Sequence, residues 1–198
     1  MAYAIYLTHP QVNIDKDTPV PKWSLSELGL QRAIAASELP WVKSIDRIVS
    51  SDETKAQETA ACFARSLSID YQIGHNMGEN DRSSTGFMPP DLFEIAANHF
   101  MDSPEVSYRG WERAVDAQAR IVASVEIAVR AHTGDGAVLL VGHGGVGTLL
   151  KCHIADRKIA RVEDQPGNGG GNIFAFDLET KSLLCDWTPM EEFTGVSS

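Results

Sequence analysis

Two histidines each follow a short apolar run, and their positions suggest shared chemistry. His9 lies in the string YLTHP after the run 1–7, and His143 lies in VGHGG after the run 137–141. Short apolar runs bounded by breakers are typical of buried strands in a parallel sheet. Ligands of open α/β sheets bind beyond the carboxyl ends of such strands. We therefore expect the two histidines to face one pocket, although they lie far apart in the sequence.

Four chemistries use a pair of histidines, and the sequence argues against three of them. Zinc needs a third ligand, often a fourth, and no HExxH pair is present. A serine hydrolase would use a G-x-S-x-G elbow, which the sequence lacks. The string GHGGVG over 142–147 matches the dinucleotide fingerprint formally, but it comes too late in the chain for a normal dinucleotide domain. A dinucleotide-binding oxidoreductase therefore stays a less favoured alternative.

Phosphoryl transfer to histidine is the chemistry for which the sequence offers every part. A neutral imidazole nitrogen attacks phosphorus, positioned cations stabilise the transferring group, and an acid protonates the leaving oxygen. His9 is the candidate nucleophile, His143 a second phosphate contact and Glu79 the acid. Lys55 and Arg82 are the candidate cations.

Alternating apolar and amphipathic segments must position these residues. Strands are predicted over 1–7, 45–50, 69–73 and 137–141, with a final hairpin over 173–176 and 182–185. Helices are predicted over 25–39, 53–67, 91–100, 110–131 and 146–154. This alternation predicts an α/β fold, a three-layer sandwich with a mostly parallel central sheet and helices on both faces. A length of 198 residues suits a single domain over 1–198.

Two segments depart from this alternation. The segment 74–90 combines glycine, asparagine, serine and paired prolines with the charged run 79–82. A loop of this length is uncommon unless it is functional, so we expect an active-site loop at 74–90. The polar tail after Trp187 is expected to be loosely held.

Composition limits the partners of the protein. The formal net charge of -10 disfavours binding to nucleic acid and to anionic membranes. Three dispersed cysteines indicate reduced thiols, as in a cytoplasm, and the first apolar run is too short for a secretory or membrane segment. We therefore expect a cytoplasmic protein without nucleic-acid or membrane partners, and its oligomeric state stays open.

Several strings, in chain order, resemble those of the histidine phosphatase superfamily, the phosphoglycerate-mutase-like proteins. The first strand of that family ends in R-H-G, where this chain has T-H-P at 8–10. LSELGLQRA at 25–33 is similar to the family's L-T-x-x-G-x-x-Q-A, and SSDETKAQETA at 50–60 to its S-S-P-x-x-R-A-x-Q-T-A. VGHGG at 141–145 matches its second histidine motif. The resemblance implies a phosphoglycerate-mutase-like fold and a phosphohistidine intermediate on His9, without a metal or other cofactor.

The departures from the family pattern concern phosphate binding. Thr8 stands where the family has an arginine, so one hydroxyl replaces a bidentate fork. Lys55 keeps the charge of a second family arginine but loses its planar geometry, and Pro10 removes a backbone donor. Loss of one preorganised donor lowers a rate by on the order of 10²–10³. The candidate phosphate contacts are Thr8, Lys55, Arg82 and Gly144, with Arg82 as the expected compensation.

The sequence therefore predicts a phosphomonoester hydrolase that acts on a small phosphorylated substrate. One alternative is a catalytically impaired member of the same fold that binds a phosphorylated ligand for regulation. A phosphoglycerate-type mutase is less favoured. A mutase must hold the phospho group in a sealed site and return it, and the altered phosphate-binding residues give no sign of such a site.

Overall fold

The computed structural model describes residues 2–167 and 169–196. Within these residues, six strands form one sheet in the order β3-β2-β4-β1-β5-β6. The strands are β1 (Tyr3–Thr8), β2 (Ile45–Ser50), β3 (Tyr71–Ile73), β4 (Ala137–Gly142), β5 (Asn172–Asp177) and β6 (Leu183–Pro189). The helices are α1 (Glu27–Ser37), α2 (Thr54–Leu67), α3 (Pro90–Asp102), α4 (Ala114–Arg130) and α5 (Gly144–Ile154). All the predicted strands and helices are present, with ends shifted by at most about four residues.

The sheet is parallel on one side and antiparallel on the other. β1 pairs with β4, β4 with β2, and β2 with β3, all in parallel. β5 runs antiparallel to β1, and β6 antiparallel to β5. The carboxyl ends of β1, β4 and β2 therefore meet at one edge, where the antiparallel β5 begins. This mixed sheet confirms the predicted α/β class.

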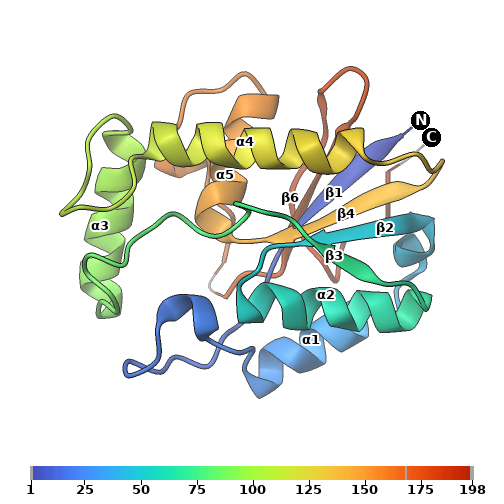
Figure 1. Ribbon diagram of the computed structural model, residues 1–198, viewed down its shortest axis with the longest axis horizontal. Helices are drawn as coiled ribbons and strands as arrows, with labels where there is room; N and C mark the ends of the chain where they lie inside the picture. Colours follow the sequence, from blue (N-terminus) through green and yellow to red (C-terminus); the bar gives the residue numbers. More distant parts are fainter. Residues whose placement is uncertain (1, 168, 197–198) are drawn as a thin grey trace.

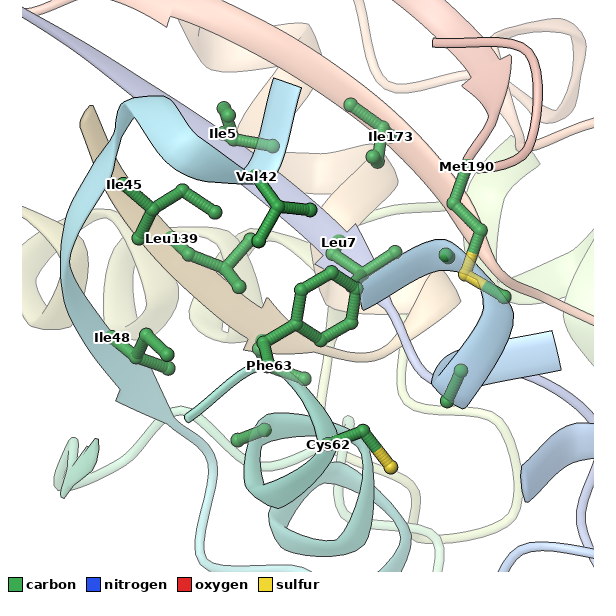
Figure 2. Close-up of a cluster of buried hydrophobic side chains, with 14 of the residues drawn as sticks. Ile5, Leu7, Val42, Ile45, Ile48, Cys62, Phe63, Leu139, Ile173 and Met190 are labelled. Carbon is green, nitrogen blue, oxygen red and sulfur yellow. The ribbon is translucent and has the colours of Figure 1, made fainter. Parts of the chain in front are cut away.

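Helices cover both faces of the sheet, with α1 and α2 on one face and α4 and α5 on the other (Figure 1). Side chains of a strand alternate between faces. In β1, Ile5 and Leu7 pack into the core beneath α1 and α2, where Phe63 is fully buried. Figure 2 shows this first core. Ala4 and Tyr6 point into the second core, beneath α4 and α5. Burial on both faces explains why β1 reads as a continuous apolar run.

The part of the tail over 188–196 is held in place, so the expectation of a loose tail is wrong there, and residues 197–198 lie outside the described residues. β6 extends to Pro189, and Met190 and Phe193 are buried in the first core. The Phe193 ring meets the Trp41 ring edge-on, with centroids 5.3 Å apart. The mostly polar composition of the tail did not predict that its two buried apolar side chains, Met190 and Phe193, hold it against the core.

Among the residues described, no helix is long and apolar enough to span a membrane.

Candidate active site

The ends of β1 and β4 bring the two histidines together, as their sequence positions led us to expect. The backbone N–H of His9 donates to the carbonyl of Gly142, over 3.0 Å. The rings of His9 and His143 lie nearly perpendicular, with centroids 5.3 Å apart. The two imidazoles therefore face each other at the carboxyl edge of the parallel strands.

A hydrogen bond fixes the tautomer of His9. Its Nδ1 lies 2.8 Å from the carbonyl oxygen of Pro10. A carbonyl only accepts, so Nδ1 carries the proton and Nε2 keeps its lone pair. Burial, aided by the charge of Lys55, lowers the pKa of His9 to about 4, although the Pro10 hydrogen bond opposes this. The imidazole is neutral at pH 7, which is the state that a nucleophile needs.

His143 presents one ring nitrogen without a partner. The side chain is fully buried, and its Nε2 lies 2.8 Å from the hydroxyl of Ser51. Its Nδ1 is buried and has no hydrogen-bond partner among the described residues. Burial lowers the pKa of His143 to about 4, despite the nearby carboxylate of Glu53. Since buried polar atoms are rarely left unpaired, Nδ1 is an open position for a polar ligand.

The Tyr6 hydroxyl holds the backbone of His143. It lies 3.1 Å from both the backbone nitrogen and the carbonyl oxygen of that residue. A Cβ at Gly142 would overlap this hydroxyl, so glycine is required where the strand ends. Tyr6 comes from the second core, and the imidazole is therefore positioned from inside the sheet.

Glu79 caps the N-terminus of α5. Its carboxylate oxygens accept from the backbone N–H groups of Gly145 at 3.0 Å, Val146 at 2.9 Å and Asn80 at 3.1 Å. The positive end of a helix favours a carboxylate there. A Cβ at Gly145 would lie 2.7 Å from the Glu79 carboxylate, so only glycine leaves room. Glu79 is thus fixed next to the second histidine motif.

Arg120 of α4 holds the loop that carries Glu79. Its guanidinium donates to the carbonyl oxygens of Gly78 at 3.0 Å and Glu79 at 3.2 Å. It also forms an ion pair with Glu112 at 2.7 Å. The loop between β3 and α3 is therefore anchored at the residues nearest to the histidines.

Lys55 is buried and paired with a carboxylate that sequence reasoning overlooked. Its ammonium donates to the Val20 carbonyl at 3.0 Å and to the carboxylate of Glu53. The other Glu53 oxygen accepts from the Glu79 backbone N–H at 2.8 Å and lies 3.5 Å from Nε2 of His143. Burial alone would raise the pKa of Glu53, but His143 and Lys55 outweigh it and lower that pKa to about 2. Glu53 is therefore ionised.

The remaining phosphate-binding candidates lie in different surroundings. The Thr8 hydroxyl donates to the Gln165 side chain at 2.8 Å and accepts from the Asn172 N–H at 3.0 Å, which ties β1 to β5. A Cβ at Gly144 would overlap the side chain of Gln165. The guanidinium of Arg82 lies 4.8 Å from the centre of the Phe93 ring, a cation–π contact. The hydroxyl of Thr8 is thus engaged within the protein.

A glycine turn supports His9 from the other side. The Gly171 N–H donates to the His9 carbonyl at 3.1 Å. Gly170 has a φ of +67°, and a Cβ there would overlap the same carbonyl oxygen. The backbone of this turn, which precedes β5, therefore packs directly against the candidate nucleophile.

A cavity of about 530 Å³, a size typical of small-molecule sites, opens next to Glu53 and Glu79, and neither His9 nor His143 is among its lining residues. The loop between β3 and α3 forms one wall and the loop after β1 forms the other. The cavity is lined by Lys16, Asp17, Thr18, Pro19, Val20, Pro21, Glu53, Glu79, Asn80, Asp81, Arg82, Ser83, Gly86 and Phe87. Glu53 is among these residues, whereas Lys55 lies behind it. Over 2–167 and 169–196, no three His, Cys, Asp or Glu side chains are grouped to hold a metal ion.

The family model of the histidine phosphatase superfamily, branch 1, matches residues 11–185. The chain belongs to this superfamily. The matched range begins after Pro10, so membership does not depend on the Thr-His-Pro string. No curated protein matches the sequence significantly.

Several solved structures share the fold of this family member at low sequence identity. A mycobacterial glucosyl-3-phosphoglycerate phosphatase is 22% identical, with a TM-score of 0.74 over 94% of this chain and 95% of that chain. Bacillus stearothermophilus YhfR is 20% identical, with a TM-score of 0.77 over 100% and 98%. A mutant phosphoserine phosphatase from Entamoeba histolytica in complex with phosphoserine is 15% identical, with a TM-score of 0.75 over 96% and 98%.

Proposed function

We propose that this superfamily member is a phosphomonoester hydrolase that acts through a phosphohistidine on His9. The observation that carries the proposal is the facing pair of imidazoles. His9 has a fixed tautomer with a free lone pair on Nε2, and His143 has an unpartnered Nδ1. A neutral nucleophile beside a second imidazole with an unpartnered ring nitrogen suits phosphoryl transfer.

The proposed reaction has two steps. In the first, Nε2 of His9 forms a bond to phosphorus while the bond between phosphorus and the ester oxygen breaks. For this step Glu79 must take up a proton against the preference of the α5 N-terminus for the carboxylate, and it gives that proton to the ester oxygen as the alcohol leaves. In the second step, water attacks phosphorus, its proton passes to the Glu79 carboxylate, and the phosphorus–nitrogen bond breaks. Inorganic phosphate departs and His9 is restored.

The remaining candidates supply charge and alignment. Lys55 and Arg82 stabilise the phosphoryl oxygens, with the N-terminus of α5 at Gly144 nearby. The Thr8 hydroxyl donates to Gln165 and accepts from the Asn172 N–H. Thr8 therefore fixes the end of β1 against β5. This role for Thr8 replaces the direct phosphate contact expected from the sequence.

A small phosphorylated metabolite fits the cavity as the substrate class. The volume of about 530 Å³ accommodates a small molecule, and the lining places the cations of Lys16 and Arg82 beside the acidic residues Asp17, Glu53, Glu79 and Asp81. Several proteins of the same fold are phosphatases by name, including those for glucosyl-3-phosphoglycerate and phosphoserine. We expect residues 1–198 to act as one domain, in the cytoplasm and without a cofactor.

The test is phosphate release from 4-nitrophenyl phosphate by the purified protein. We expect steady turnover by the wild type and its loss in His9→Ala. His75→Ala is the matched control, because His75 is exposed and lies outside the cavity lining. Equal rates for the wild type and His9→Ala would refute the proposal. Radiolabelled substrate should also leave acid-labile label on the wild-type chain and none on His9→Ala.

A phosphate-binding protein without turnover is the second candidate function. Two observations favour it: the Thr8 hydroxyl is engaged by Gln165 and Asn172, and the charge of Lys55 is already paired with Glu53. Calorimetric titration with phosphate or vanadate separates the two functions. Binding without any release of phosphate from an ester would support this candidate.

A further inference from the structure

Glu53 lies between the cavity and the buried cation Lys55. Its side chain lines the cavity, and its carboxylate forms an ion pair with the Lys55 ammonium. Both residues are almost fully buried, with 7% and 3% of their surfaces exposed. An anion that enters the cavity therefore meets the Glu53 carboxylate before it meets Lys55.

The position of Glu53 is closely fixed by its surroundings. One carboxylate oxygen accepts from the Glu79 N–H at 2.8 Å and lies 3.5 Å from Nε2 of His143. A Cβ on residue 78 would lie 3.2 Å from this oxygen, so Gly78 leaves the space that the carboxylate occupies. Groups from the β4–α5 junction, from the β3–α3 loop and from the start of α2 thus converge on a single carboxylate.

The charge of Lys55 is not free for a phosphate. Its ammonium is already paired with the Glu53 carboxylate. A phosphoryl group carries about 1.5 to 2 negative charges at pH 7. To bind tightly, it needs a cation that is not already neutralised.

We propose that Glu53 is a specificity-determining residue that competes with the substrate phosphate for Lys55. The Lys55 ammonium binds the phosphate only to the extent that its ion pair with the Glu53 carboxylate is broken. The site therefore binds highly charged phosphates weakly and favours phosphoryl groups of lower charge. The inference rests on the proposed function only in taking phosphate as the anion.

The direct test is the affinity of Glu53→Gln for inorganic phosphate and for vanadate, measured by isothermal titration calorimetry. Glutamine keeps the size and an acceptor oxygen but removes the charge. Close charge pairs couple strongly, so we expect the dissociation constant to fall at least about tenfold. Asp52→Asn is the matched control: it removes the same charge one residue away, from an exposed side chain, and should leave the affinity unchanged.

Two further variants make the test specific. In the double variant Glu53→Gln/Lys55→Met the gain in phosphate affinity should disappear, because this gain depends on the charge of Lys55. Glu53→Asp keeps a carboxylate, but its shorter side chain places that carboxylate further from Lys55. It should therefore show a smaller gain in phosphate affinity than Glu53→Gln, and it serves as the test if Glu53→Gln folds poorly. Unchanged affinity in Glu53→Asp and Glu53→Gln, or an equal gain in Asp52→Asn, would overturn the inference.

The outcome is separable from that of the proposed function. If no variant hydrolyses esters but Glu53→Gln binds phosphate more tightly, the competition stands and the hydrolase proposal fails. If the wild type hydrolyses esters and the affinity of Glu53→Gln is unchanged, the hydrolase proposal stands and the competition fails.

Discussion

Replacing Glu79 with glutamine should affect stability and catalysis in separately measurable ways. The carboxylate accepts three backbone hydrogen bonds at the start of α5. Glutamine keeps one acceptor oxygen and turns its amide N–H₂ toward the N–H of either Gly145 or Val146. A lost hydrogen bond to a charged group costs about 1.5–3 kcal/mol, and loss of the charge at a helix N-terminus adds about 0.3–1 kcal/mol.

The expected loss in free energy of unfolding is therefore about 3 kcal/mol. For a chain of this size, each kcal/mol lowers Tm by about 2–4 °C, so calorimetry should record a decrease of about 6–12 °C. Glu126→Gln is the matched control. Glu126 forms only surface ion pairs, with Arg130 and Lys181, so its loss should lower Tm far less than that of Glu79 does.

The catalytic effect should depend on the leaving group. General acid catalysis contributes about 10²–10⁴ to a rate, and a poor leaving group such as an alkoxide needs the proton most. For Glu79→Gln we expect kcat/KM to fall about 10³-fold on an alkyl phosphate and less than about tenfold on 4-nitrophenyl phosphate. The ratio kcat/KM is the right measure, because it reports steps up to the first irreversible one. Equal losses on the two substrates would show that Glu79 positions α5 and does not donate the proton.

Three further outcomes follow from the structure. The pKa values of His9 and His143 are lowered from 6.5 to about 4, so between these pH values the unfolded chain binds more protons than the folded one. The free energy of unfolding, measured by urea titration, should therefore be highest above pH 6.5 and decline toward pH 4. A free energy that does not change with pH over this range would contradict the prediction. Gly170→Ala should lower kcat about 10²-fold by displacing the His9 backbone. Gly167→Ala, also at positive φ but with open space around it, should cost about 1 kcal/mol in stability and keep kcat. Phe193→Ala should cost about 3–4 kcal/mol by calorimetry, and a loss under about 1 kcal/mol would mean that the tail is not docked.

The sheet and the two histidines could be predicted because they depend on local patterns. The runs before His9 and His143 are apolar throughout, as strands buried on both faces require. Each histidine directly follows the strand that its run forms, so the parallel pairing of β1 with β4 brings the two side chains to one edge.

The charge state of the site could not be predicted, because it depends on contacts between distant segments. Glu53 precedes a helix, where an acidic side chain is ordinarily solvated. It turns inward because the backbone of Gly78 and Glu79, on a loop about 25 residues further on, leaves space and offers an N–H. The Thr8 hydroxyl likewise finds its partners in Gln165 and Asn172, more than 150 residues away. No local pattern reports such contacts.

The docking of the tail could not be predicted from the sequence for a different reason. Met190 and Phe193 are isolated apolar residues in a polar stretch, with no periodicity to mark them. Their burial depends on a gap beside Trp41 that only the assembled core defines.

The position of β1 in the sheet has a consequence for biosynthesis. Of the strands in this sheet, β1 is synthesised first, yet both of its neighbours, β4 and β5, come from residues 137 and beyond. At about 5–20 residues per second, on the order of ten seconds or more pass before either partner exists. During that time the apolar segment Tyr3–Thr8 has no strand to pair with, and an unpaired apolar strand is prone to aggregate. The candidate nucleophile His9 is thus synthesised before the segments of β4 and β5 that complete its surroundings.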